Sequence, residues 1–190
     1  MTIGLFIVLG LLALLSIYTI LIYNNLVMLK NSVAKAWANI DVLLVQRHDE
    51  LPRLVEVCKQ YMTYEQQTMQ KVMLARSSVA AARQQSNVAA LGRAETQLRS
   101  GLGQLFALSE AYPDLKANEH FRHLQLRITD LENAIADRRE FYNESVNLNN
   151  IRIEQFPDAI IARVFNFEHQ PLLAFQDEGT SDVNIKSLFG

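Results

Sequence analysis

The sequence predicts an all-α protein in which an N-terminal transmembrane helix continues into a long antiparallel helical bundle. Three observations lead to this fold class. Residues 3–22 form an unbroken apolar run, and no charged side chain occurs between Met1 and Leu29. Apolar residues then recur at steps of three and four, without the alternation of apolar and polar residues that is typical of a sheet. Seven glycines and four prolines in 190 residues leave few positions that would interrupt a helix.

The apolar run has the length that a membrane span needs. Twenty residues at about 1.5 Å per residue give about 30 Å, the thickness of the hydrocarbon core of a bilayer. Its polar interruptions, such as Ser16 and Thr19, are small or amphipathic, and a hydroxyl can donate back to the preceding turn. The predicted anchor residues are Ile3, Leu5, Phe6, Ile7, Val8, Leu9, Leu11, Leu12, Leu14, Leu15, Ile17, Ile20, Leu21 and Ile22.

Two other readings of this run are a cleaved signal peptide and a buried core helix. A signal peptide would need a basic start, a shorter apolar stretch and a cleavage site, and residues 23–26 provide none. A lipoprotein would need a cysteine directly after the run, whereas the single cysteine is Cys58. A core helix would be shorter and capped. We therefore expect an uncleaved anchor.

The charges after the run predict the orientation. Lys30 and Lys35 come first, and no acid occurs before Asp41. By the positive-inside rule, the body lies in the cytoplasm and the N-terminus outside. The formal net charge of −2 excludes a strongly basic nucleic-acid surface. We divide the chain into an anchor (1–24), a helical-bundle domain (25–168) and a flexible C-terminal tail (169–190), with no cofactor or metal.

The first helix of the body is predicted to continue directly from the membrane. Its apolar stripe consists of Leu26, Leu29, Val33, Trp37, Ile40, Leu44, Leu51, Leu54, Cys58 and Tyr61. Pro52 lies inside the stripe, so the helix either kinks there or a new helix begins. We favour a kink, because Leu51 would be a poor N-cap.

Further helices are expected over residues 64–83 and 88–112, separated by the polar segment 84–87. Gly101 and Gly103 are positions where another helix could approach closely. The segment 112–114 predicts a turn, because Pro113 disfavours helical geometry at the residue before it. Asn118 then suits the N-cap of the last long helix.

That last helix carries the clearest heptad pattern, and it ends at Phe156–Pro157, with a short aromatic segment (160–167) behind it. Its first half is apolar, and its second half is polar. Polar residues in such a seam set register or partner choice at a cost in stability. The candidate self-association or packing seam consists of Phe121, Leu124, Ile128, Leu131, Ile135, Arg138, Tyr142 and Asn149.

Two further groups of side chains are open to interpretation. The aromatic residues of the body are expected in the core, with a ligand-binding box as the alternative. They are Trp37, Tyr61, Tyr64, Tyr112 and Tyr142. The asparagines 143, 147, 149 and 150 either form a network that fixes helix pairing or are solvated amides near a fraying helix end.

The chain resembles the bacterial LemA family over about residues 3–167. The resemblance lies in the segments Ala36–Val42, Arg47–Val55, Ala107–Glu119, Arg138–Asn143 and Phe156–Pro157, in the expected order. It implies an N-terminal anchor and a helical-bundle body, and it implies no activity. We expect the anchor to cross the bacterial inner membrane once. Some members look like lipoproteins, and this chain lacks their cysteine.

The motifs of common enzymes do not occur. His120 and His123 lie three residues apart, but a zinc site needs three or four converging ligands and the HExxH and paired-cysteine motifs are missing. The sequence has no P-loop and no nucleophile elbow. We therefore expect a protein that is not an enzyme.

Three functions remain under consideration. The first is a membrane-anchored bundle that self-associates into a homo-oligomer as a structural, scaffolding or membrane-organising component. The second is an accessory subunit or adaptor that binds another membrane protein or an envelope protease. The third is an enzyme or sensor that uses the polar seam around Arg138, Tyr142 and Asn149.

Overall fold

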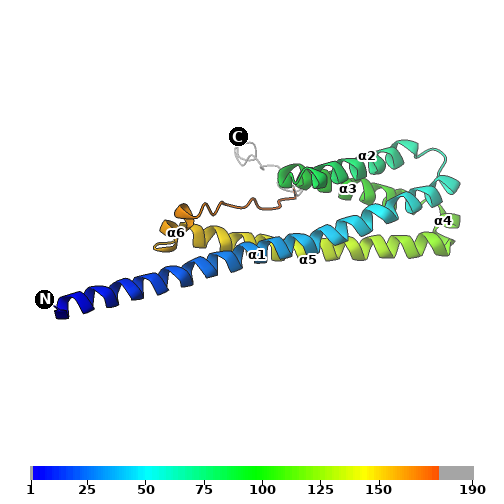
Figure 1. Cartoon of the computed structure of the whole chain (residues 1–190). Coiled ribbons are helices and arrows are strands. Elements are labelled where there is room, and N and C mark those ends of the chain that lie inside the picture. Colours follow the sequence, from blue (N-terminus) through cyan, green and yellow to red (C-terminus); the bar gives the residue numbers. More distant parts are fainter. Residues whose placement is uncertain (1, 176–190) are drawn as a thin grey trace, which may run out of the picture. The chain divides into compact units, whose positions relative to one another are not determined.

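The computed structural model describes residues 2–175, and all regular secondary structure in that range is helical (Figure 1). This confirms the predicted fold class, including the long apolar N-terminal helix and the packing of the helices as a bundle. The helices are α1 (Thr2–Tyr61), α2 (Gln66–Gln84), α3 (Val88–Ser109), α4 (Pro113–Ala117), α5 (Glu119–Glu154) and α6 (Asp158–Val164).

Helix α1 is continuous over 60 residues, so the helix of the body does continue from the apolar run and no new helix begins at Pro52. A proline inside a helix has no N–H for the carbonyl four residues earlier, which is here that of His48. The guanidinium of Arg76 in α2 replaces the missing donor, because its Nε donates to the His48 carbonyl oxygen at 2.8 Å. The freed carbonyl is therefore satisfied by a neighbouring helix.

The chain divides into two compact units. Among the described residues, the first unit comprises residues 2–40 and 138–172, and the second comprises residues 41–137 and 173–175. This division follows contacts between the helices. The predicted boundaries at residues 24 and 168 instead separate the expected anchor and tail from the body, and they stay predictions. Of the predicted tail, residues 176–190 lie outside the described residues.

In the first unit, α1 and α5 run antiparallel. The rings of Trp37 and Tyr142 lie 5.5 Å apart between centroids, while Ile22 and Leu26 of α1 share a buried apolar cluster with Ile153 of α5. A later residue of α1 thus lies beside an earlier residue of α5, as antiparallel helices require. Helix α6 completes this cluster and lies beside α1 in Figure 1.

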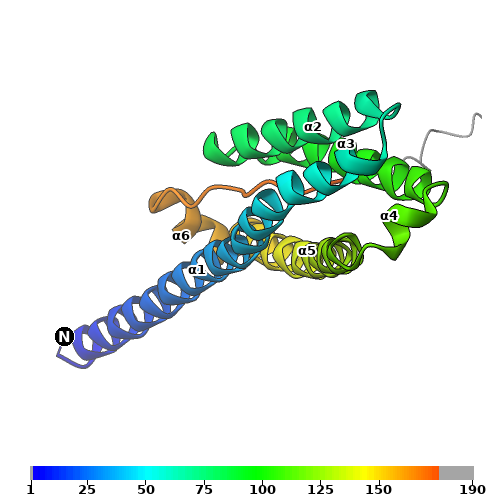
Figure 2. The ribbon, with the colours of Figure 1, turned by 90° about the vertical axis from the view of Figure 1, so that its right-hand side faces the viewer.

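In the second unit, α2 also runs antiparallel to the adjoining part of α1. Arg76 of α2 contacts His48, and Arg83, two turns further on in α2, pairs with Asp41 at 3.2 Å. Helices α2 and α3 form a hairpin and lie side by side in Figure 2. Gly101 allows this close packing, since a Cβ there would lie 3.3 Å from the Val72 side chain.

The helix ends follow the predicted signals closely. Asn118 is the predicted N-cap, because its side-chain oxygen accepts from the backbone N–H of Phe121 at 3.1 Å. Asn87, which was assigned only to a polar loop, caps α3 in the same way by accepting from the N–H of Ala90 at 2.9 Å. The predicted turn at Pro113 contains the short helix α4, with the proline at its first position. The aromatic segment after Pro157 is partly helical as α6.

The expected aromatic core is only partly correct. Tyr142 is buried, and Trp37, Tyr61 and Tyr112 are half-buried. Tyr64 is 90% exposed, so the expectation of a core position was wrong there. Tyr64 lies in the non-helical connection between α1 and α2, where no helix covers it.

Candidate functional site

The predicted anchor residues form the exposed first part of α1. The most apolar stretch of this helix has a mean hydropathy of 2.8 and only 6% of it is buried within the chain. Ser16 and Thr19 donate back to the carbonyl oxygens four residues earlier at 2.8 and 2.9 Å, as expected for hydroxyls in a span. Ile22 is the one predicted anchor residue that is buried. By length, composition and exposure, this helix fits membrane anchoring.

The predicted seam of α5 is covered by the chain's own helices. Phe121, Leu124, Ile128, Leu131 and Ile135 are buried in the second unit. In the first unit, Tyr142 and Asn149 are buried, and Arg138 is exposed. This burial fits packing within one chain, and a role of the seam in self-association stays a prediction.

A second apolar stripe of α5 faces outward in the first unit. Phe141, Leu148 and Ile151 are 50, 51 and 52% exposed. Their spacing of seven and three residues places them on one face of the helix. No described residue covers these side chains fully, so the stripe is available to a partner.

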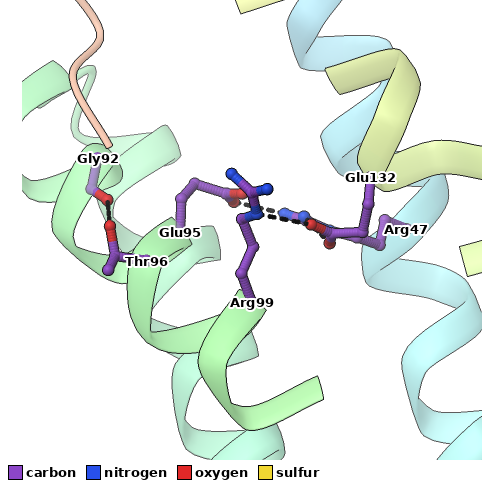
Figure 3. A network of polar contacts seen from close by, with 6 residues as sticks. All are labelled: Arg47, Gly92, Glu95, Thr96, Arg99 and Glu132. Atoms are coloured by element: carbon purple, nitrogen blue, oxygen red, sulfur yellow. Dashed lines mark hydrogen bonds and ion pairs between the residues drawn. The ribbon is translucent and has the colours of Figure 1, made fainter. Parts of the chain in front are cut away.

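A buried cluster of charged side chains lies in the second unit (Figure 3). Arg47 of α1 donates from Nη2 to Glu95 Oε1 of α3 at 2.5 Å and from Nη1 to Glu132 Oε1 of α5. Arg99 of α3 lies 3.4 Å from the other Glu132 oxygen. The cluster therefore joins three helices and balances two positive with two negative charges.

Burial controls the electrostatics of this cluster. The side chains of Arg47 and Glu95 are 1% and 0% exposed. Burial raises the pKa of Glu95, and the Arg47 guanidinium opposes this shift. Burial by itself would lower the pKa of Arg47, but Glu95 and Glu132 together raise it above its ordinary value. Each buried charge thus depends on its partner, and loss of one partner would leave the other unpaired.

This cluster was missed at the sequence level, although a signal for it exists. Arg47 lies between Leu44 and Leu51 on the apolar stripe of α1, and Glu95 lies between Leu91 and Leu98 of α3. A single charge inside an otherwise apolar stripe indicates either a buried ion pair or the place where the buried stripe ends. The sequence does not show which two charges meet.

The first part of the C-terminal segment, residues 173–175, packs on α3 beside this cluster. Leu173 is 1% exposed, and the Phe175 ring lies 5.9 Å from the Arg99 guanidinium carbon. A Cβ at Gly92 would overlap with the carbonyl oxygen of Ala174, so only glycine allows the segment to come this close. Gly92 carried no signal in the sequence.

The polar seam residues bind the chain itself. Tyr142 Oη donates to the Pro171 carbonyl oxygen at 3.0 Å, and burial raises the pKa of this phenol. Asn150 exchanges two hydrogen bonds of 2.9 Å with the backbone of Gln170. Of the two readings of the asparagines, a bonding network holds for Asn150, although its partner is the C-terminal segment rather than a helix.

The two histidines of α5 lie on a shallow groove of about 370 Å³ together with Glu50 and Glu56. Within residues 2–175, no three side chains of His, Cys, Asp or Glu come together as a metal site would require. The described part of the chain thus offers helix packing, an exposed apolar helix and a structural charge cluster.

These features define a membrane-associated helical protein. More specifically, the chain belongs to the LemA family, whose sequence profile matches residues 36–186.

Curated relatives are magnetosome proteins. MamQ 1 and MamQ 2 of Paramagnetospirillum magneticum are each 28% identical to this chain over 90 residues. MamQ of Magnetospirillum gryphiswaldense is 26% identical over the same length. In each case the match covers 47% of this chain and 33% of the relative. The chain thus spans about a third of the length of these relatives.

Proposed function

We propose that the protein is a single-pass component of the bacterial inner membrane that self-associates to scaffold or organise that membrane, without catalysing a reaction. The observation that carries this proposal is the outward-facing stripe of Phe141, Leu148 and Ile151 on α5. It lies in the same unit as the apolar part of α1. Large apolar side chains aligned on one exposed face are typical of helix-to-helix interfaces.

The membrane itself would favour such assembly. Anchored copies diffuse in two dimensions at a high effective concentration, so a modest stripe is sufficient to bring helices together. Homo-oligomers with a repeated patch are the commonest soluble assemblies, and the same symmetry argument holds at a bilayer surface.

The orientation belongs to the same proposal. Lys30 and Lys35 follow the apolar run, which supports a cytoplasmic body. Protease added to the outside of intact spheroplasts should therefore leave the body whole. Cleavage of the body under these conditions would reverse the orientation.

The stripe gives the test of self-association. Full-length protein is cross-linked in native membranes, and its mass is then measured in mild detergent. We expect a homo-oligomer for the natural chain, and monomer for Leu148→Glu, because a buried unpaired carboxylate opposes the interface. The matched control is Leu74→Glu at a 69% exposed position of α2, which should leave the oligomer unchanged.

A strictly monomeric natural chain would contradict the proposal.

The alternative role of an adaptor has its own support in a pocket of about 540 Å³ between α1 and α2. Met62, Met69 and Met73 line it, and flexible thioethers adapt to varied apolar partners. Stoichiometric heteromeric products in the same cross-linking experiment, without homomeric ones, would favour the adaptor.

A further inference from the structure

We infer that α6 is a second membrane-contacting element, whose exposed apolar face lies in the interfacial layer of the same bilayer that α1 enters. This inference rests on the proposed anchoring by α1, and it goes beyond it in assigning lipid as the occupant of a surface on the body. Five observations, all within the first unit, carry it.

The first observation is the place where α6 contacts α1. Ala162 of α6 is buried in one cluster with Ile22 and Leu26, and Ile161 packs against that cluster. Ile22 is the last residue of the apolar run. The contact thus fixes α6 at the level where the chain leaves the hydrocarbon.

The second observation is aromatic packing at the same level. The ring of Tyr23, the first residue after the run, lies 4.7 Å from the ring of Phe165 and 5.9 Å from that of Phe167, between centroids. Amphipathic aromatic side chains concentrate at the boundary between lipid and water. Here Tyr23 is such a side chain, and the rings of Phe165 and Phe167 pack against it directly behind the span.

The third observation is the exposed face of α6. Phe156 lies in the turn before α6, Ile160 and Val164 lie four residues apart on one side of that helix, and all three side chains are apolar. They are 79, 56 and 66% exposed, and the neighbouring Phe165 is 51% exposed. Exposed apolar side chains in such density indicate contact with an apolar phase.

The fourth observation is that the opposite side of α6 is tied to the protein. Asp158 is buried and ion-paired with Arg152 of α5, and Ala162 is 1% exposed. Helix α6 therefore has a fixed inner side and an outer apolar side. An interfacial helix is arranged in this way, in the plane of the interface with its apolar side toward the acyl chains.

The fifth observation is the charge at the edge of the apolar face. Arg163 is exposed next to Val164. A long basic side chain beside an apolar surface can extend to the phosphate groups of the lipids while its stem stays in the apolar layer. The surface thus matches a bilayer boundary better than a purely apolar protein partner.

The test measures depth in the bilayer. Full-length protein carrying Ile160→Cys is labelled with a nitroxide and reconstituted into vesicles of phosphatidylethanolamine and phosphatidylglycerol. Collision rates are compared for oxygen, which partitions into lipid, and for a nickel chelate, which stays in water. Leu11→Cys serves as the reference in the span, and Leu74→Cys as an exposed apolar position in the second unit. Val164→Cys repeats the measurement one turn further along α6.

The native cysteine does not interfere with this labelling. Cys58 is buried, and burial raises the pKa of its thiol to about 12, so the label goes to the introduced cysteine. Unlabelled natural chain treated in the same way verifies this.

We expect the ratio of oxygen to nickel collisions at positions 160 and 164 to be several-fold above that at position 74 and below that at position 11. A ratio at 160 and 164 equal to that at 74, with position 11 in lipid, would overturn the inference and leave the anchor intact. Low collision rates with both reagents would also overturn it, because protein would then cover α6. A water-like ratio at position 11 would overturn the proposed anchoring as well.

Discussion

Arg47 occupies a position on α1 that leucines occupy one turn before and after it. A buried charge is tolerated there only because Glu95 and Glu132 are both within reach. Replacing well-paired buried ions by apolar residues is often neutral, whereas removing one partner is strongly destabilising. The cluster thus selects one pairing of α1, α3 and α5 within the second unit more than it adds stability.

This reasoning predicts the effect of Arg47→Met. Loss of the guanidinium leaves Glu95 buried without a cation, and we expect the free energy of unfolding to fall by about 3–5 kcal/mol at neutral pH. Arg47→Met combined with Glu95→Leu should recover most of this loss, since Glu132 still has Arg99. Urea unfolding in mild detergent, followed by circular dichroism, measures both, and the exposed Arg93→Met is the control.

The stability of the single variant Arg47→Met is predicted to depend on pH. In the folded variant the pKa of Glu95 is raised further above its ordinary value of 4.5, so the folded state binds the proton more tightly than the unfolded state. Stability relative to the natural chain is therefore least affected below pH 4.5 and falls as the pH rises through the folded pKa. A deficit that does not change between acidic and neutral pH would contradict this assignment.

Arg76 compensates for Pro52, because it donates to the His48 carbonyl oxygen that the proline leaves without a helical donor. Arg76→Met should cost about 1.5–3 kcal/mol, because it removes a charged donor from the free His48 carbonyl. In a Pro52→Ala background the cost should be smaller, since the alanine N–H supplies that bond within α1. A double-mutant cycle by urea unfolding measures the coupling, with Arg53→Met, 70% exposed, as the control. Equal costs in both backgrounds would show that Arg76 does not compensate for the proline.

Among the structural elements, the C-terminal segment 173–175 is held against α3 by shape. At Gly92 even one methyl group would overlap with the backbone of Ala174, and backbone cannot move aside as a flexible side chain can. The segment would therefore have to leave α3 and expose Leu173 and Phe175. Gly103 lies on the same helix with open space around its Cβ position.

Gly92→Ala and Gly103→Ala thus form a matched pair. We expect Gly92→Ala to destabilise the protein by about 1–3 kcal/mol and to make residues 173–175 accessible to protease. Gly103→Ala should stabilise it by about 0.5–1 kcal/mol, since alanine restricts the unfolded chain. Hydrogen exchange and limited proteolysis of the C-terminal segment compare the two. Equal protection in both variants would mean that the segment does not depend on the close approach at Gly92.

Features of the helices that depend on nearby residues could be predicted from the sequence, and features that depend on distant residues could not. Helix positions, the cap at Asn118 and the close packing at Gly101 were predicted from local signals, because each depends on residues within a turn or on a repeated apolar spacing. The expectation of a close approach was wrong at Gly103, where a Cβ would have open space around it. The partners of Arg47 and the role of Gly92 depend on residues 48 to 85 positions away in the chain, and no local pattern encodes such pairing. Tyr64 was assigned to the core from its residue type alone. It is exposed because it lies in the non-helical connection between α1 and α2.

For the whole molecule, the decisive feature is the exposed apolar part of α1. The large side chains between Ile3 and Leu21 are each more than half exposed, which is unfavourable in water for a stretch of this length. A bilayer removes this surface from water and places the charged body at its boundary. The proposed assembly through α5 and the proposed lipid contact of α6 both depend on that placement.

Flotation of membranes after alkaline carbonate extraction tests this placement most directly. The full chain should float with the lipid, and a variant carrying both Leu11→Arg and Leu14→Arg should be released, because each central arginine costs about 2.5–3.5 kcal/mol of insertion. Leu74→Arg controls for the added charge outside the span. Recovery of the natural chain in the soluble fraction, or as a mature form that begins after Tyr23, would contradict the account.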